Sequence, residues 1–408
     1  MKDIGVEIEL NDTNNYNTTM NRTIWNIIKD EFRTIFTDSG AMLLLCFAMM
    51  IYTIIYSTAY GNEVVRNVAI AIVDEDNTPS SRNLIKGLIG GPNTNVSYEV
   101  QSINEAQELF YRNEVYGIVY IPDGYERYMQ SGRAANIAAI LDGSHMLLYK
   151  QVLEQLTYDA LYAGATIETA ELIANGNNAL DNEGIVNPLT LATTHLYNPS
   201  LGYGSFVMPS ILIVIIQQTL IIGIAMINAR RRNRGEIATS ASYSQATKVI
   251  TSKILTYIII YSTNLTLILG IVWPIFGFPF SERLGDIAIL LLIYLIASTA
   301  IALTLSHLFS RRESPIILLL WSSVPILLLA GISYPKEAFP SILYDLGRIF
   351  PSSSAVDAFI SIGTMGASLH DVRGEVITLI ILAVLYLILA ICTERRVSHS
   401  TAIKKVLK

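Results

Sequence analysis

Long apolar runs dominate this chain and restrict what it can fold into. About six runs approach 20 residues, the length at which a helix crosses the roughly 30 Å apolar core of a bilayer. Only 15% of the 408 residues are charged, whereas soluble domains carry about a quarter. The sequence therefore predicts a polytopic α-helical membrane protein with six transmembrane helices. The predicted spans are residues 41–59, 206–227, 254–276, 286–307, 315–332 and 376–392.

Basic residues predict the orientation, because short cytoplasmic loops of membrane proteins are enriched in Lys and Arg. They gather in three segments: the loop 228–253, the short segment after the fourth run, and the tail 393–408. These segments are therefore predicted to be cytoplasmic, and an even number of spans places the N-terminus on the same side. The residues concerned are Arg230, Arg231, Arg232, Arg234, Lys248, Lys253, Arg311, Arg312, Arg395, Arg396, Lys404, Lys405 and Lys408.

Residues 1–40 form the predicted cytoplasmic N-terminal arm. The first 20 are polar and are expected to be disordered. An amphipathic helix follows, with Lys29, Asp30 and Arg33 opposite an apolar face, and is expected to lie on the cytoplasmic leaflet before the first span. The alternative is a core helix of a small cytoplasmic domain. The apolar face comprises Ile24, Ile27, Ile28, Phe32, Ile35 and Phe36.

Residues 60–205 have shorter apolar runs and more charge, and are long enough for a domain of their own. Between the first two spans they are predicted to form an extracytoplasmic α+β domain. Strands are expected near residues 67–76, 96–102, 116–125 and 134–144, alternating with helices, including one that Thr78 caps. Asp74, Glu75 and Asp76 favour a solvated turn over a metal site, and His145 and His195 lack metal-ligand spacing.

Several motifs of catalysis and transport are missing from the sequence. We find no G-x-x-x-x-G-K-[ST] phosphate loop, G-x-S-x-G elbow or H-E-x-x-H motif. The spans hold few ionisable residues, which disfavours a proton- or sodium-coupled transporter. Cys46 and Cys392 lie in apolar runs and suggest no disulfide framework. The polar residues of the spans could line a path or form interhelical hydrogen bonds: Gln217, Gln218, Asn264, Ser322 and Ser323.

This layout resembles the permease subunit of bacterial ABC type-2 exporters with a large external domain between the first two spans. Two stretches sharpen the likeness. "RNRG", which ends at Gly235, is similar to the start of that family's coupling loop, although Ala238 replaces an acidic residue and Glu236 follows the glycine directly. The stretch after the fifth run is similar to the re-entrant external segment, here 333–374. The residues that carry this second likeness are Ala330, Gly331, Tyr334, Pro335, Phe339, Pro340, Phe350 and Pro351.

The resemblance implies a non-catalytic subunit of a dimeric exporter in the bacterial inner membrane. A separate cytoplasmic ATPase would bind ATP and Mg and contact the loop at Arg231, Arg232, Arg234, Gly235 and Glu236. Amphipathic small molecules, drugs or lipids would be exported, and a periplasmic adaptor and an outer-membrane channel are further partners that the resemblance allows. No cofactor on this chain and no nucleic-acid partner are expected. The alternative is a membrane receptor or assembly scaffold whose external domain binds a ligand.

Overall fold

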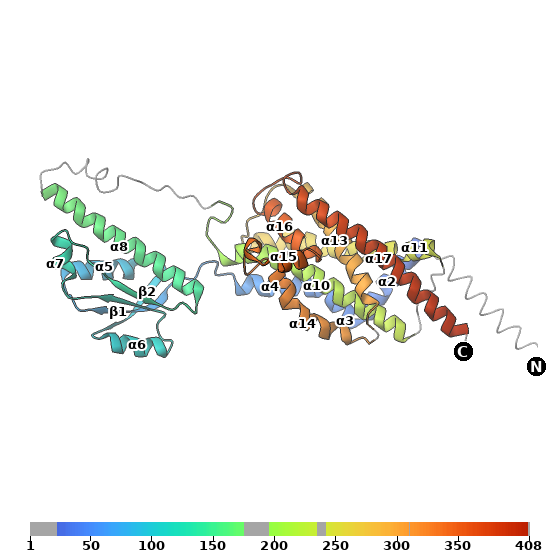
Figure 1. Ribbon diagram of the computed structural model, residues 1–408, viewed down its shortest axis with the longest axis horizontal. Helices are drawn as coiled ribbons and strands as arrows, with labels where there is room; N and C mark the ends of the chain where they lie inside the picture. The colour runs from blue at the N-terminus through green and yellow to red at the C-terminus, as the bar shows by residue number, and fades with distance from the viewer. Residues whose placement is uncertain (1–22, 175–195, 235–241, 310, 407–408) are drawn as a thin grey trace, which may run out of the picture. The chain divides into compact units, whose positions relative to one another are not determined.

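The computed structural model describes residues 23–174, 196–234, 242–309 and 311–406 (Figure 1). The chain divides into two compact units. One is Val64–Thr194, and the other comprises Met1–Glu63 and His195–Lys408. Each unit has its own hydrophobic core, so we describe each by itself.

The larger unit is a helical bundle built around α10, which is buried along most of its length. Helix α10 packs against α4, α13, α14 and α16, and α2 packs against α11. The helices are α2 Ile24–Thr37, α3 Ser39–Met42, α4 Met49–Ala59, α10 Tyr203–Asn233, α11 Tyr243–Leu267, α12 Trp273–Ile275, α13 Leu284–Ser306, α14 Ser314–Leu329, α15 Ser341–Gly347, α16 Pro351–Gly363 and α17 Arg373–Val406. Two π-helical turns, Leu43–Ala48 and Ile268–Val272, and a 3-10 turn, Lys336–Ala338, complete it.

Among the described residues, five helical segments are long and apolar enough to cross a membrane: Ser39–Ala59, Tyr203–Asn233, Tyr243–Ile275, Leu284–Ser306 and Arg373–Val397. Their outward faces remain apolar, as on α17, where Ile381 and Ile388 are exposed. Such faces suit lipid rather than water. The fifth predicted span, residues 315–332, corresponds to α14, whose 16 residues fall short of the roughly 20 that a full crossing needs. The predicted count of six is therefore not confirmed by helix length.

The smaller unit is a four-stranded sheet in the order β2-β1-β3-β4, in which β4 alone is antiparallel to its neighbour. Residues of β1 alternate between the two faces. Ile70 and Ile72 pack beneath α5, α7 and α8, whereas Ala71 and Val73 pack against α6 (Figure 1). The elements are β1 Val68–Asp74, α5 Pro79–Gly90, β2 Thr94–Val100, α6 Ile103–Tyr111, β3 Gly117–Ile121, α7 Tyr125–Gln130, β4 Ala138–Leu141 and α8 Met146–Ala174.

The local predictions for this unit hold except at one helix. Thr78 caps α5 through a capping box with Ser81, and Pro79 occupies the first turn. Helix α7 was not predicted, because the three residues before it are Pro-Asp-Gly, a sequence that is typical of a turn. Gly124 adopts φ +84, a conformation that glycine reaches without strain. The turn thus leads directly into one short helix.

Candidate functional site

Three consecutive arginines near the end of α10 each bond to a different part of the bundle. Successive residues of a helix point about 100° apart, so their side chains diverge. Arg230 donates to Asp38 at 2.6 Å, and Arg231 donates to Glu31 at 2.5 Å. Arg232 donates to the carbonyl oxygens of His307 and Phe309 at 2.8 and 3.0 Å. This end of α10 is therefore held by α2 and by the chain after α13.

Glu31, the partner of Arg231, has no exposed surface. Its carboxylate accepts from Arg231 and, at 2.7 Å, from the Tyr257 hydroxyl of α11. Burial raises the pKa of Glu31, but the charges of Arg231 and Lys253 and the two hydrogen bonds more than offset this, so the pKa lies below its usual value. A buried carboxylate tolerates its charge only with such partners. Glu31 is therefore an ionised link between α2, α10 and α11.

A series of hydrogen bonds extends this site across the bundle. Lys253 of α11 donates to the side-chain oxygen of Asn228 at 3.0 Å, and the Asn228 amide donates to Ser306 of α13 at 2.7 Å. All three side chains are buried. Helices α10, α11 and α13 thus each contribute a polar group to one continuous path.

Asp38 links the start of α3 to the last turn of α10 and to the segment that follows α13. Its Oδ1 accepts from the backbone N–H of Gly40 and Ala41 and also from Arg312, while its Oδ2 accepts from Arg230. Burial raises the pKa of Asp38, but the Ala41 hydrogen bond and the two arginines outweigh burial and lower it. Asp38 is therefore charged, and it holds the start of the first span against the arginines.

His307 connects Arg232 to α17. Its Nδ1 lies 2.6 Å from Arg232 Nη2, and arginine has no acceptor, so Nδ1 must accept. Its Nε2 lies 3.4 Å from the carboxylate of Glu394. Burial lowers the pKa of His307 to about 4, despite Glu394, with Lys253 and Arg232 adding to the effect. The ring is therefore neutral near pH 7, with its proton on Nε2 toward Glu394.

We call these residues the arginine network. It joins α2, α10, α11, α13 and α17 and consists of Glu31, Asp38, Asn228, Arg230, Arg231, Arg232, Lys253, Tyr257, Ser306, His307, Arg312 and Glu394.

The predicted coupling residues divide between this network and the surface. Arg231 and Arg232 use their charges on partners within the chain, whereas Arg234, the C-cap of α10, is exposed. Gly235 and Glu236 lie outside the described residues. The helix predicted to lie on the membrane surface, α2, packs against α11 and buries Ile28 and Ile35. Sequence analysis missed Glu31, although it lies three and four residues from these two isoleucines, on the same helical face.

The predicted external segment is a chain of turns and short helices. Gly331 adopts φ +82 directly after α14, and the rings of Tyr334 and Phe339 stack with centroids 6.0 Å apart. Pro335 precedes the 3-10 turn and Pro340 precedes α15. Phe350 is the N-cap of α16 and Pro351 its first residue, a position where proline costs no hydrogen bond.

Two of the polar residues predicted in the spans make hydrogen bonds between helical segments. Gln217 Oε1 accepts from the backbone N–H of Ser352 at 2.9 Å, and Asn264 donates to the carbonyl oxygen of Leu45 at 3.3 Å. Gln218 is buried, and its amide has no partner among the described residues. The other two, Ser322 and Ser323, are half-buried in α14.

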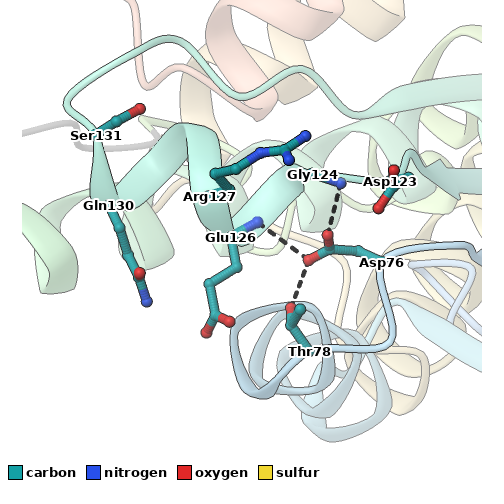
Figure 2. Close-up of a pocket in the computed structure, with 8 residues that line it drawn as sticks. All are labelled: Asp76, Thr78, Asp123, Gly124, Glu126, Arg127, Gln130 and Ser131. Carbon is teal, nitrogen blue, oxygen red and sulfur yellow. Dashed lines mark hydrogen bonds between the residues drawn. The ribbon is translucent and has the colours of Figure 1, made fainter.

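The smaller unit, which we call the α/β unit, contains the acidic run Asp74, Glu75 and Asp76. These carboxylates accept hydrogen bonds from groups within the same unit. Asp76 lines a pocket at the ends of β1 and β3 and accepts from the backbone N–H of Gly124 and Glu126 and from Thr78 (Figure 2). Asp74 accepts from Ser81 at 2.6 Å, and the Glu75 carboxylate accepts from Tyr120. No group of three or more His, Cys, Asp or Glu able to hold a metal occurs among the described residues. His145 bonds to Asp142, and His195 lies outside the described ranges.

Comparison with known proteins identifies the family of this chain. Residues 39–392 match the model of the family described as "ABC-2 family transporter protein". The chain belongs to the ABC-2 transporter family. It is 23% identical over 361 residues to the "Probable multidrug ABC transporter permease YbhR" of Escherichia coli strain K12, covering 88% of this chain and 94% of that protein. The same match is found in Escherichia coli O157:H7. As an ABC-2 chain, the protein is a multi-pass membrane subunit of an ABC transporter.

The arginine network lies partly inside and partly outside the region that matches the ABC-2 family. Most of the network lies within residues 39–392. Glu31 and Asp38 precede this range and Glu394 follows it. These acidic residues of the ABC-2 chain therefore join segments outside the matched region to the end of its central helix α10.

Proposed function

We propose that this chain is the permease subunit of an ATP-driven exporter and that the arginine network transmits motion from a separate ATPase to the spans. The observation that carries the proposal is Glu31, an ionised and fully buried residue bonded to Arg231 of α10 and Tyr257 of α11. Helices α10 and α11 flank residues 235–241, which lie within the predicted coupling loop 228–253. An ATPase that pushes this loop or α2 would displace both helices together.

The charges of the network favour rigid transmission over independent movement of the helices. Separating Glu31 from Arg231 would deprive a fully buried carboxylate of its hydrogen-bonded cation, which costs several kcal/mol. Helices α2, α10 and α11 are therefore expected to move as one body. Nucleotide binding by the ATPase would then shift the population between transporter conformations.

The direction of the helices supports six crossings. Helix α14 begins beside Arg312, which bonds to Asp38 in the arginine network, and α17 ends its crossing at Glu394, beside His307. The chain must therefore reach the opposite end of the bundle between α14 and the start of α17. Helix α14 and the external segment after it would complete this fifth crossing. The N-terminal helix and the end of α17 then share one side of the membrane.

That shared side is the cytoplasm in this proposal, because it carries Arg230, Arg231, Arg232 and Arg312. The α/β unit, inserted between α4 and α10, would lie outside the bacterial inner membrane. Two permease chains would form the transporter with their ATPases. An adaptor and an outer-membrane channel stay predictions from the resemblance.

The substrate class rests on the relative and on the spans. The E. coli relative is described as a multidrug permease, and the spans of this chain are apolar with a few amide and hydroxyl groups. Amphipathic drugs, lipids or other small molecules fit this composition. Export of such a molecule is the function that we propose.

Co-purification tests the proposal. The tagged chain would be extracted in mild detergent and assayed for vanadate-sensitive ATP hydrolysis. Arg234→Glu reverses an exposed charge beside the loop and should reduce the bound ATPase; Lys86→Glu reverses an exposed charge on α5 and should not. Arg231 is unsuitable because its charge is needed by Glu31. A folded chain without any associated hydrolysis would overturn the exporter and favour the receptor or scaffold.

A further inference from the structure

The turn after α14 is locked to α16 by one buried lysine. Lys336 Nζ lies 2.7 Å from the carbonyl oxygen of Ser353 and 2.8 and 2.7 Å from the two carboxylate oxygens of Asp357. An ammonium group has three donors, so all three are used. The Lys336 side chain is 10% exposed and that of Asp357 is 47% exposed. Lys336 is therefore largely covered by the protein, whereas the Asp357 carboxylate is accessible to water.

Gly331 creates the space for this lysine. A Cβ at Gly331 would lie 2.6 Å from Lys336 Cε and 2.7 Å from its Cγ, and the glycine also adopts φ +82. Any other residue would therefore be strained and would collide with the lysine stem. The turn can hold the Lys336 side chain in this position only because residue 331 is a glycine.

A second contact holds the same two helices. The Ser353 hydroxyl donates to the carbonyl oxygen of Leu329 at 3.3 Å, at the end of α14. Lys336 and Ser353 therefore hold the end of α14 and the turn after it against the first turns of α16. We call Lys336, Ser353 and Asp357 the latch.

The latch continues to the central helix of the bundle. The residue before Ser353, Ser352, donates its backbone N–H to Gln217 of α10, and both side chains are fully buried. Gln217 precedes Asn228 of the arginine network by 11 residues, about 17 Å of helix at 1.5 Å per residue. One uninterrupted helix, α10, thus carries the latch contact at one level and the arginine network at another.

We propose that Lys336 and Asp357 are positioning residues that keep the external segment closed over α16 and release it when α10 moves. This inference rests on the proposed exporter function and extends it. Motion received at the arginine network would pull on Gln217 and Ser352, tilt the first turn of α16, and separate Asp357 from Lys336. The half-exposed Asp357 suits this task, because water can solvate its carboxylate when the two charges part. A carboxylate as deeply buried as that of Glu31 would resist such a separation.

Cysteine accessibility tests the latch without knowledge of the substrate. Cys46 and Cys392, the two cysteines of the sequence, would be replaced by Ala, and Ser352→Cys would introduce a thiol at a fully buried position. In the full chain with its co-purified ATPase, a charged maleimide should label this thiol slowly. Lys336→Met should raise the labelling rate about fivefold, as expected for loss of a half-exposed ion pair.

Two further variants separate the latch from general damage. Glu337→Gln removes an exposed charge next to Lys336 and should leave the rate unchanged. The charge swap Lys336→Asp/Asp357→Lys should return the rate toward that of the unsubstituted pair. Labelling of Lys336→Met at the original rate would overturn the latch, and so would a swap that labels as fast as Lys336→Met.

Nucleotide separates failure of this inference from failure of the proposed function. With the ATPase bound, ATP should accelerate labelling when Lys336 is present and add little in Lys336→Met. If no ATPase co-purifies, the exporter proposal fails. The latch is then still tested by comparing the labelling rates without ATP in the protein that keeps Lys336 and in Lys336→Met. If ATP is hydrolysed without changing the rate in either protein, the exporter proposal stands and the latch fails.

Discussion

The helical bundle and the α/β unit place charged side chains in opposite ways. In the bundle, apolar side chains cover much of the exterior, while Glu31 and Arg231 form an ion pair inside. In the α/β unit, Ile70 and Ile72 fill the interior, and Asp76 at a strand end bonds to backbone N–H groups of a loop. A surface that faces lipid cannot carry charge cheaply. Charged groups of the bundle are therefore concentrated where they can satisfy one another.

This difference predicts how much stability is lost when each charge is removed. A carboxylate at a loop loses only its hydrogen bonds when it is replaced, because water can solvate the groups left behind. Replacing a buried carboxylate leaves a cation without any partner. Substitutions in the arginine network should therefore cost more than equivalent ones in the α/β unit. The following predictions test this ranking, from the largest effect to the smallest.

Replacement of Glu31 should have the largest effect. Glu31→Ala leaves Arg231 buried without its carboxylate, and we expect a loss of about 3–5 kcal/mol in the free energy of unfolding. Denaturant titration in mild detergent measures this. Asp30→Ala, at the exposed neighbouring position, should cost less than about 1 kcal/mol. Equal losses for the two variants would contradict the central role of Glu31.

The free energy of unfolding should depend on pH because the pKa of the buried His307 is lowered. The pKa of His307 is lowered to about 4, whereas an unfolded chain has a value of about 6.5. Below that value the unfolded state binds the proton more readily, so stability should fall as the pH drops from about 6.5 toward 4, by roughly 2 kcal/mol. The difference between the parent protein and His307→Gln in thermal unfolding across this range isolates the contribution. Parallel curves would contradict it.

Two tyrosines of α11 compare a charged with a neutral hydrogen-bond acceptor. Tyr257 donates to Glu31, and Tyr261 donates to the hydroxyl of Thr219, both at 2.7 Å and both within the bundle. Tyr257→Phe should cost about 1.5–3 kcal/mol and Tyr261→Phe about 0.5–1.5 kcal/mol, because bonds to charged groups are stronger. The same detergent titration measures both. A larger loss for Tyr261→Phe would break the comparison.

The smallest effect is expected in the α/β unit. Asp76→Asn weakens the hydrogen bonds to Gly124, Glu126 and Thr78 (Figure 2) and should cost about 1 kcal/mol, the usual value of a capping side chain. Hydrogen exchange of the Glu126 amide in the full chain should report the change. Asp123→Asn, in the lining of the same pocket, serves as the control and should leave that amide protected.

Local patterns in the sequence predicted much of the secondary structure. Strand β1 follows from its run of β-branched and small apolar residues, and α5 from Thr78 and Pro79, which act on backbone groups within a few residues. Apolar length identified five segments that the structure also finds long and apolar enough to span. Helix α14 was predicted longer than it is, because hydropathy does not register where the turn at Gly331 ends the helix.

The site could be predicted only in part. Arg231 and Arg232 were singled out, but their partners Glu31 and His307 were not. Glu31 and Arg231 are 200 residues apart in the sequence, and no local periodicity connects them. The same limit applies to Lys336 and Asp357, which resemble ordinary surface charges until the turn at Gly331 brings them together.

Apolar length and alternation in the sequence predicted a membrane protein with a separate α+β domain, because these patterns act through the local backbone and the solvent around it. The packing of the helices determines which charges are buried, which are exposed and which helix ends they join. The physical reason is that a buried charge is stable only beside a specific partner. That partner is supplied by the packing of distant helices, so Glu31 acquires its role when α2, α10 and α11 meet.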